Sequence, residues 1–334
     1  MTHGLVVFLK KILRSYFSMY FYVYLHPEVF AEAQSDGEHA QSLLISILSN
    51  FLKDCFLSVF EDDRWNQEIK DHLETWPSNM TKIKIQSILA VFKKRNRILF
   101  NIRPDYLSEK NDLKCVFDQA SNLEIDLLVI DEANHRDFMD RFEISTIKSY
   151  YYSKFFYSRS ELNENGKTCV LGEMDQDSFL EYHFNKGIKY AKKIHICDRF
   201  VGSKNLPDNF LYTIKVFLAW LGNILYDPDN CEIIFHTGQP KGEGAHHIEH
   251  KIKSYKIRFL KKTKVSIIFY DKLPHQRFLL TNQIAMDIDR GMDFFDKNTK
   301  KCRDTRITYR DVDDAVKLLD AYSDSENNKF SISF

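Results

Sequence analysis

One short segment places a histidine, an arginine and an asparagine at a spacing that suits phosphate chemistry. His275 and Arg277 are separated by one residue, and Asn282 follows after four more. A histidine can attack phosphorus or bind a phosphate, and an arginine can hold a phosphate through two parallel hydrogen bonds. The segment therefore predicts a site that engages phosphodiesters. In this interpretation His275 is the nucleophile or phosphate ligand, Arg277 is the anion clamp and Asn282 orients the histidine.

This spacing resembles the phospholipase D motif His-x-Lys-x4-Asp, and further residues strengthen the resemblance. Over residues 190–305 the chain is similar to the C-terminal domain of MIT-domain-containing proteins, an atypical member of the phospholipase D superfamily. The matching segments are a strand and its end at 194–201, a helix start at 209–210, a strand end at 235–237 and the Arg-Gly-Met-Asp sequence at 290–293. The chain departs from the family at Arg199, where proline is usual, and at Asn282, where aspartate is usual.

The resemblance implies a phospholipase D-like α/β sandwich with a mainly parallel sheet, in which Arg290, His236 and Lys204 contribute to phosphate binding. Catalytic members use one histidine as the nucleophile, a lysine to neutralise the developing charge and a second histidine to protonate the leaving oxygen. A single motif of this kind occurs in the sequence, around His275. Turnover by that mechanism would therefore require a homodimer.

A basic stretch follows the second expected strand of this half. It holds seven positive charges within fourteen residues, with aromatic residues between them: Lys251, Lys253, Lys256, Arg258, Lys261, Lys262 and Lys264. Such a stretch can follow a nucleic-acid backbone without reading its sequence. The alternative is a solvated helix face and turn.

A zinc peptidase is a minor alternative, because one segment matches the inverted zincin pattern His-x-x-Glu-His. His246 and His250 share a helix face at this spacing, and Glu249 would activate a metal-bound water. The third ligand would come from elsewhere, and Glu326 is the candidate by distance along the chain. His246 is also a candidate, with His236, for lining the phosphate pocket.

Acidic residues in the first half offer a different chemistry. The pairs at 62–63 and 131–132, together with Asp137, lie near the expected ends of strands and helices. A metal-dependent nuclease could use such a cluster, and the pair at 131–132 directly follows an apolar strand, where α/β folds carry their active groups. Isolated acidic pairs are more often surface charge, so the primary prediction includes no metal site.

Composition excludes several classes of protein. Forty-seven basic and forty-seven acidic residues balance, so an anionic partner must be met by a local patch. The six cysteines form no Cys-x-x-Cys pair, which favours reduced thiols in the cytoplasm. The longest uncharged N-terminal run, at 15–25, is too short for a bilayer span of ~20 residues. No glycine-rich phosphate loop or dinucleotide fingerprint is present, so no cofactor is expected.

Apolar patterns predict two domains. The first, at 1–165, is an α/β domain of unassigned topology with strands at 21–25, 98–102 and 127–130 and helices at 39–60 and 82–94. A linker is expected at 166–189, the phospholipase D-like domain at 190–322 and a polar tail at 323–334. Within the second domain we expect strands at 194–197, 231–236 and 265–270, helices at 209–225, 245–258 and 311–322, and a hairpin of 277–281 with 283–288.

These observations lead to one preferred function and one runner-up. The preferred function is binding or cleavage of nucleic acid by a cytoplasmic bacterial protein, in defence against phage or mobile elements. The runner-up is a non-catalytic adaptor, or complex subunit, whose second domain binds a phosphorylated ligand or a partner protein. The bacterial origin is inferred from a composition rich in Phe, Tyr, Lys, Asn and Ile, which is typical of AT-rich genomes.

Overall fold

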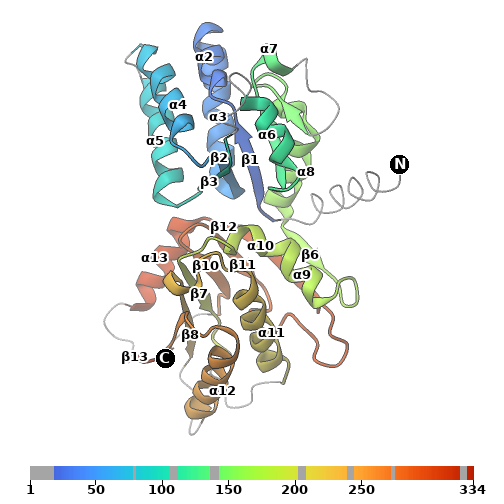
Figure 1. The fold of residues 1–334 in the computed structure, drawn as a ribbon. Helices are drawn as coiled ribbons and strands as arrows, with labels where there is room; N and C mark the ends of the chain where they lie inside the picture. The colour runs from blue at the N-terminus through green and yellow to red at the C-terminus, as the bar shows by residue number, and fades with distance from the viewer. Residues whose placement is uncertain are drawn as a thin grey trace. The chain divides into compact units, whose positions relative to one another are not determined.

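The computed structural model describes residues 19–77, 80–104, 112–135, 143–201, 208–238, 244–271, 275–323 and 329–334. The chain forms two compact units (Figure 1). The N-terminal unit is Tyr20–Glu161, and the C-terminal unit contains Met19 and Leu162–Phe334. The segment expected to be a linker belongs to the C-terminal unit and forms strand β6 (Lys167–Cys169) and helices α9 (Gln176–His183) and α10 (Asn185–Ile188).

The N-terminal unit is built on a parallel sheet of five strands in the order β3-β2-β1-β4-β5. The strands are β1 (Phe21–Leu25), β2 (Cys55–Phe60), β3 (Ile98–Ile102), β4 (Ile125–Val129) and β5 (Ile144–Ser145). Every residue of β1 and β2 is buried, as expected for parallel strands covered on both faces. The order reverses beside β1, and open α/β sheets place ligands at the carboxyl ends of strands at such a point.

The helices before β5 lie in the connections between the strands of this unit, whereas the last helix follows β5. They are α2 (Glu28–Ser35), α3 (Glu38–Asp54), α4 (Arg64–Thr75), α5 (Met80–Lys94), α6 (Asp112–Ala120), α7 (Glu132–His135) and α8 (Lys154–Asn165), and a short 3-10 turn is formed by Tyr150–Tyr152. The helix expected at 39–60 was too long, because α3 ends at Asp54 and β2 begins at once. Residues 55–60 are almost uniformly apolar, so the sequence pattern cannot separate a buried strand from a buried helix there.

The C-terminal unit contains a mixed sheet of eight strands in the order β13-β9-β8-β7-β10-β11-β12-β6. The further strands are β7 (Lys193–Cys197), β8 (Glu232–Gly238), β9 (Lys264–Tyr270), β10 (Phe278–Thr281), β11 (Ala285–Ile288), β12 (Thr305–Arg310) and β13 (Lys329–Ser333). The pairs β7–β8 and β8–β9 are parallel, and the remaining pairs are antiparallel. The α/β class and the β10–β11 hairpin are confirmed, but the second sheet is mixed rather than mainly parallel.

The polar tail expected after residue 323 is wrong in part, because β13 pairs antiparallel with β9 along its whole length. Alternation of Phe330 and Ile332 with serines is a strand pattern that composition alone obscured.

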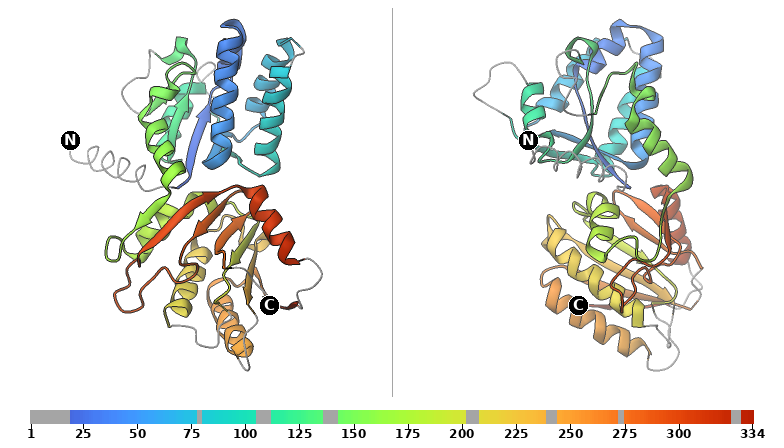
Figure 2. Two further views of the ribbon diagram at one scale, coloured as in Figure 1. Left: turned by 180° about the vertical axis from the view of Figure 1, so that it is seen from behind. Right: turned by 90° about the vertical axis from the view of Figure 1, so that its right-hand side faces the viewer.

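Helices cover both faces of this sheet. Helices α11 (Asp208–Ile224) and α12 (Gly244–Phe259) lie on one face and α13 (Val312–Ser323) lies on the other, as the right-hand view of Figure 2 shows. The core under α13 is formed by Cys197, Tyr270, Phe278, Leu280, Ala285, Val312, Ala315 and Leu319. None of the helices in the described ranges has both the length and the apolar character needed to cross a membrane.

Candidate functional site

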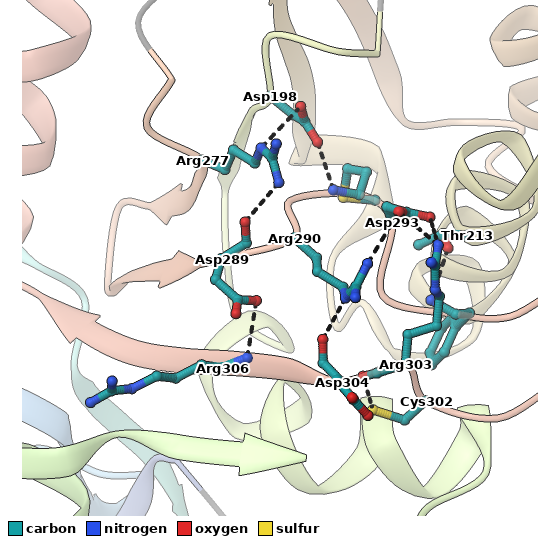
Figure 3. A network of polar contacts seen from close by, with 12 residues as sticks. Asp198, Thr213, Arg277, Asp289, Arg290, Asp293, Cys302, Arg303, Asp304 and Arg306 are labelled. Carbon is teal, nitrogen blue, oxygen red and sulfur yellow. Dashed lines mark hydrogen bonds and ion pairs between the residues drawn. The ribbon is translucent and has the colours of Figure 1, made fainter. Parts of the chain in front are cut away.

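A buried aspartate at the end of β7 anchors the site. Asp198 is fully buried, and its carboxylate accepts the backbone N–H of Met292 at 2.7 Å and that of Phe200 at 2.9 Å. Gly291 lies directly against the carboxylate with φ +60°, and a Cβ there would overlap the Asp198 oxygen. The aspartate therefore fixes the turn that contains Gly291 to the end of β7 (Figure 3).

The charge of this carboxylate is only partly compensated. Burial raises the pKa of Asp198 to about 6, although the two backbone N–H groups and Arg277 oppose the shift and Asp293 adds to it. The Nε of Arg277 lies 4.0 Å from the Asp198 Oδ1. This separation exceeds that of a hydrogen-bonded ion pair, so Arg277 offsets only part of the Asp198 charge.

The guanidinium of Arg277 is held in place by other groups. Its Nη1 donates to the Asp289 carbonyl at 2.7 Å, and its Cζ lies 4.9 Å from the centre of the Phe200 ring. Its buried Nε has no hydrogen-bond partner among the described atoms, and the side chain is 24% exposed. The Nε faces Asp198 and is closed to solvent, so an anion could reach only the outer part of this oriented cation.

His275 and Arg199 lie beside this arginine, both exposed to solvent. The Arg199 Nη1 is 2.9 Å from the His275 Nε2. Because a guanidinium has no acceptor, the histidine nitrogen must accept this hydrogen bond. The lone pair that a nucleophile would use is therefore occupied in this arrangement. Two arginines and one imidazole gather next to Phe200, whose ring centre lies 6.2 Å from that of His275.

The sequence analysis predicted that Asn282 orients His275, but the structure places Asn282 just after the far end of β10. Its Oδ1 accepts the backbone N–H of Lys192 at 2.9 Å, just before β7 begins. Strand β10 is antiparallel to β7, with Phe278 opposite Cys197 and Thr281 opposite Ile194. The antiparallel register thus sends the two halves of the motif to opposite ends of β7.

Arg290 is engaged by acceptors of its own segment. Its Nε donates to the Asp304 carbonyl, and its Nη1 lies 3.6 Å from the Asp293 Oδ2. Arg303 binds the same carboxylate more closely, with Nη1 2.7 Å from each oxygen. Burial raises the pKa of Asp293, and these arginines oppose the shift. The contacts in Figure 3 thus give Arg290 a role in holding the segment together.

His236 lies in the protein core. Its Nε2 is 2.8 Å from the His195 Nδ1, and its Nδ1 is 2.8 Å from the Tyr270 hydroxyl. Burial, followed by the charge of Lys193, lowers the pKa of His195 to about 4, so this histidine is neutral at physiological pH. The three side chains form a polar chain across β7, β8 and β9, which sequence spacing could not reveal because its members come from separate strands.

The basic stretch lies mainly away from His275. Helix α12 begins after the carboxyl end of β8 and runs back over about 24 Å to the amino end of β9. The helix therefore delivers three of the basic residues to the amino ends of the parallel strands, opposite the end where His275 lies: Lys261, Lys262 and Lys264. Lys262 is 3.0 Å from Asp229 and Lys264 is 2.7 Å from Glu232, so both are paired.

The basic residues within α12 do not form one face. Lys251 and Arg258 are seven residues apart and project from nearly the same side, because an α-helix has about 3.6 residues per turn. Lys253 and Lys256 project from roughly the other side. Lys204 and the side chain of His246 lie outside the described residues, as does Glu326.

In the N-terminal unit, the acidic pairs are engaged with neighbouring side chains. Asp131 lies 3.4 Å from the His26 Nδ1 and also accepts from Asn134, and these hydrogen bonds outweigh burial and hold its pKa well below the usual range. Both Asp62 oxygens lie 2.9 Å from the Arg64 Nε. Asp137 lies outside the described residues, and those that are described contain no group of three side chains suited to a metal ion.

Comparison of the sequence with protein-family models finds no model that matches, and comparison with curated proteins finds no match.

Proposed function

We propose that the C-terminal unit binds the phosphodiester backbone of nucleic acid through Arg199, His275 and Arg277. The observation that carries this proposal is the 2.9 Å contact of Arg199 with His275, beside an oriented Arg277 whose side chain is 24% exposed. Arginines suit phosphate because their planar group donates two parallel hydrogen bonds.

We also propose that this unit has the phospholipase D-like sandwich that the sequence resembles. In support, two separate parts of the resemblance meet in space. Asp198, from the first matching strand, accepts the Met292 N–H inside the Arg-Gly-Met-Asp sequence, and the close approach requires Gly291. The resemblance rests on the sequence segments alone, so this contact is independent support for it. A solved structure whose chain path departed from that sandwich would remove this part of the proposal.

Binding is favoured over cleavage by the surroundings of His275. Its Nε2 accepts from Arg199, and Asn282 is held at the other end of β10. A catalytic histidine needs a free nucleophilic nitrogen and a second histidine as acid. Cleavage by this mechanism would require Arg199 to move and a second copy of the chain to supply that acid.

The test is the binding of labelled single- and double-stranded DNA and RNA over a series of salt concentrations. Arg199→Ala should weaken binding of every sequence and lower the slope of log affinity against log salt by about 1, as expected for one lost phosphate contact. Lys262→Ala is the control, because that lysine is paired with Asp229 near the amino end of β9, away from His275. Equal affinity of Arg199→Ala and wild type would refute the site.

Two further outcomes would change the proposal. Metal-independent cleavage by a dimer, abolished in His275→Ala and unaffected by EDTA, would make the protein a phosphodiesterase. Binding of a phosphorylated headgroup or protein partner, with no salt-sensitive binding of nucleic acid, would favour the adaptor. The setting we propose, defence against phage in a bacterial cytoplasm, is tested by phage plaque counts on cells expressing wild type or Arg199→Ala. Equal counts for the two would argue against it.

A further inference from the structure

A groove in the N-terminal unit lies between helices α4 and α5, which are neighbours in Figure 1. Helix α4 packs against α2 and β2, whereas α5 packs against α3, so different elements hold the two helices in place. The space between them has a volume of about 340 Å³ and reaches Ile98 at the start of β3. This volume is at the lower end of the range for small-molecule sites.

The floor of the groove is apolar. Trp65, Ile69 and Leu73 follow one another at four-residue spacing on one side of α4, and they are 2%, 4% and 4% exposed. The Trp65 indole N–H donates to the Leu25 carbonyl at 2.7 Å, so the polar group of this ring is already satisfied inside the unit. Leu89 continues the apolar lining on α5. An alkyl chain placed on this floor would be removed from water, which is favourable.

The groove is long and narrow. Its lining residues on α5 extend from Lys82 to Lys93, which corresponds to about 16 Å along a helix axis. A volume of about 340 Å³ spread over such a length has a small cross-section. An unbranched chain therefore fits this shape better than a compact group of fused rings.

The charged residues that line the groove carry an excess of positive charge. They are three lysines and one glutamate: Lys70, Lys82, Lys93 and Glu74. The Lys70 Nζ lies 3.8 Å from a Glu74 carboxylate oxygen, so these two charges offset each other. Lys93 is exposed and makes no ion pair within the described part of the chain, and Lys94 and Arg95 follow it directly. The Lys93 end of the groove therefore attracts an anion.

We propose that this groove binds a free fatty acid of medium chain length, with the alkyl chain on the apolar floor and the carboxylate beside Lys93. Three observations support this ligand: the volume of the groove, its length and its excess positive charge. The site belongs to the N-terminal unit and does not depend on nucleic-acid binding by the C-terminal unit. Because the ligand contacts both α4 and α5, its binding stabilises the folded N-terminal unit.

The first test measures the binding of hexanoate, octanoate and decanoate to the full chain by titration calorimetry, below the concentrations at which they form micelles. We expect one site, with an affinity that rises about threefold for each added methylene. Decyltrimethylammonium has the same chain as decanoate and a positive head group, and it should bind more weakly. Affinity that is independent of chain length, equal binding of the cation, or binding to anionic lipid vesicles without binding of decanoate would overturn the proposal.

The second test locates the alkyl chain. Ala90 is an exposed residue of α5 that lines the groove, so Ala90→Phe fills the groove without removing a core side chain. The matched control is Ser87→Phe, because Ser87 is exposed on the same helix and lies outside the lining. With both variants shown to be folded by circular dichroism, only Ala90→Phe should lose decanoate binding. Unchanged binding in Ala90→Phe would place the ligand elsewhere.

The third test locates the carboxylate. Lys93→Glu reverses a charge that lines the groove, and Lys94→Glu reverses its neighbour in the same last turn of α5, outside the lining. We expect decanoate affinity to fall about tenfold in Lys93→Glu and to change little in Lys94→Glu. Both variants place an acidic residue at the end of the same helix, so any effect on the helix itself is shared. Equal losses in the two variants would refute the role of Lys93.

Discussion

Each unit contains a buried aspartate that faces an arginine from a distant part of the chain, and the two pairs differ in how completely they are closed. In the N-terminal unit, the Arg159 Nε donates to the Asp54 Oδ1 at 2.6 Å, and the two side chains are 2% and 0% exposed. In the C-terminal unit, Arg277 remains 4.0 Å from Asp198 and is 24% exposed. Both pairs join one carboxylate and one guanidinium, but only the pair in the N-terminal unit is in hydrogen-bonding contact and closed to solvent.

The difference shows what each arginine can do. Arg159 also donates to the Asn50 carbonyl and the Tyr150 hydroxyl, and its burial keeps outside ligands away from it. Arg277 is oriented by the Asp289 carbonyl and the Phe200 ring, while Asp198 relies on backbone N–H groups rather than on the arginine. A closed pair stabilises its unit, and an open pair can exchange its weak partner for an anion.

The largest effect should come from breaking the closed pair. Arg159→Met leaves Asp54 as a buried charge without compensation, and we expect a loss of about 3–5 kcal/mol in the unfolding free energy of the N-terminal unit. Urea unfolding measures this loss. The double variant Asp54→Asn, Arg159→Met should recover part of it, because the uncompensated charge is gone. A loss below about 1 kcal/mol would mean that the pair behaves as an exposed one.

A smaller loss of stability is expected when Gly291, which packs against Asp198 and Arg277, is replaced. Gly291→Ala places a Cβ against the Asp198 carboxylate and 2.7 Å from the Arg277 Cδ, at a positive φ. Strain and overlap together should cost about 3 kcal/mol and should also weaken anion binding. The matched control is Gly172→Ala, which has φ +85° but nothing within 4 Å. Equal losses in the two variants would show that backbone strain alone is responsible.

The third prediction concerns pH. The pKa of Asp198 is raised to about 6 in the folded state, against an ordinary value of about 3.9. Its contribution to stability is therefore fully present below about pH 4 and is lost as the pH rises through 6, by about 3 kcal/mol. Asp198→Asn should remove this dependence, although it also loses one acceptor for a backbone N–H.

Urea unfolding of wild type and Asp198→Asn between pH 4 and 8 tests this expectation, since the other carboxylates titrate alike in both proteins. The groups that act on Asp198 are Arg277 and Asp293, and both are retained. The difference in unfolding free energy should shift in favour of the variant as the pH rises. Parallel curves would mean that Asp198 is as well compensated as a closed pair.

The smallest effect should come from the polar chain under α13. Tyr270→Phe removes the hydroxyl that lies 2.8 Å from the His236 Nδ1, and we expect a loss of about 1 kcal/mol. Because this chain is buried like the Asp54 pair, the affinity for nucleic acid should not change. A clear loss of affinity in the folded variant would place His236 in the binding site after all.

The elements that were predicted well are those with a local signature. Strand β1 has the expected bounds, and the alternation of apolar strands and helices after residue 190 is confirmed, with β10 and β11 as a hairpin. Apolar period and turn residues determine these elements over a few positions. Strand β2 was missed because it follows α3 without a break, so no turn marks the change.

The contacts of the candidate site depend on how β10 is paired with β7, and this register could not be predicted from the sequence. The motif spacing placed Asn282 with His275, whereas the antiparallel pairing of β10 with β7 separates them. The same pairing brings Arg277 to Asp198, a partner about eighty residues away in sequence.

The two edges of the C-terminal sheet have a consequence for the order of folding. One edge is β6, at residues 167–169, and the other is β13, at residues 329–333. Strand β6 pairs with β12, whose residues follow it by well over one hundred positions. During synthesis the first edge must wait for its partner, and the second edge forms last. Pairing over such separations slows folding, so a partly synthesised chain would leave β6 unpaired until β12 is made and β9 open on one side until β13 is made.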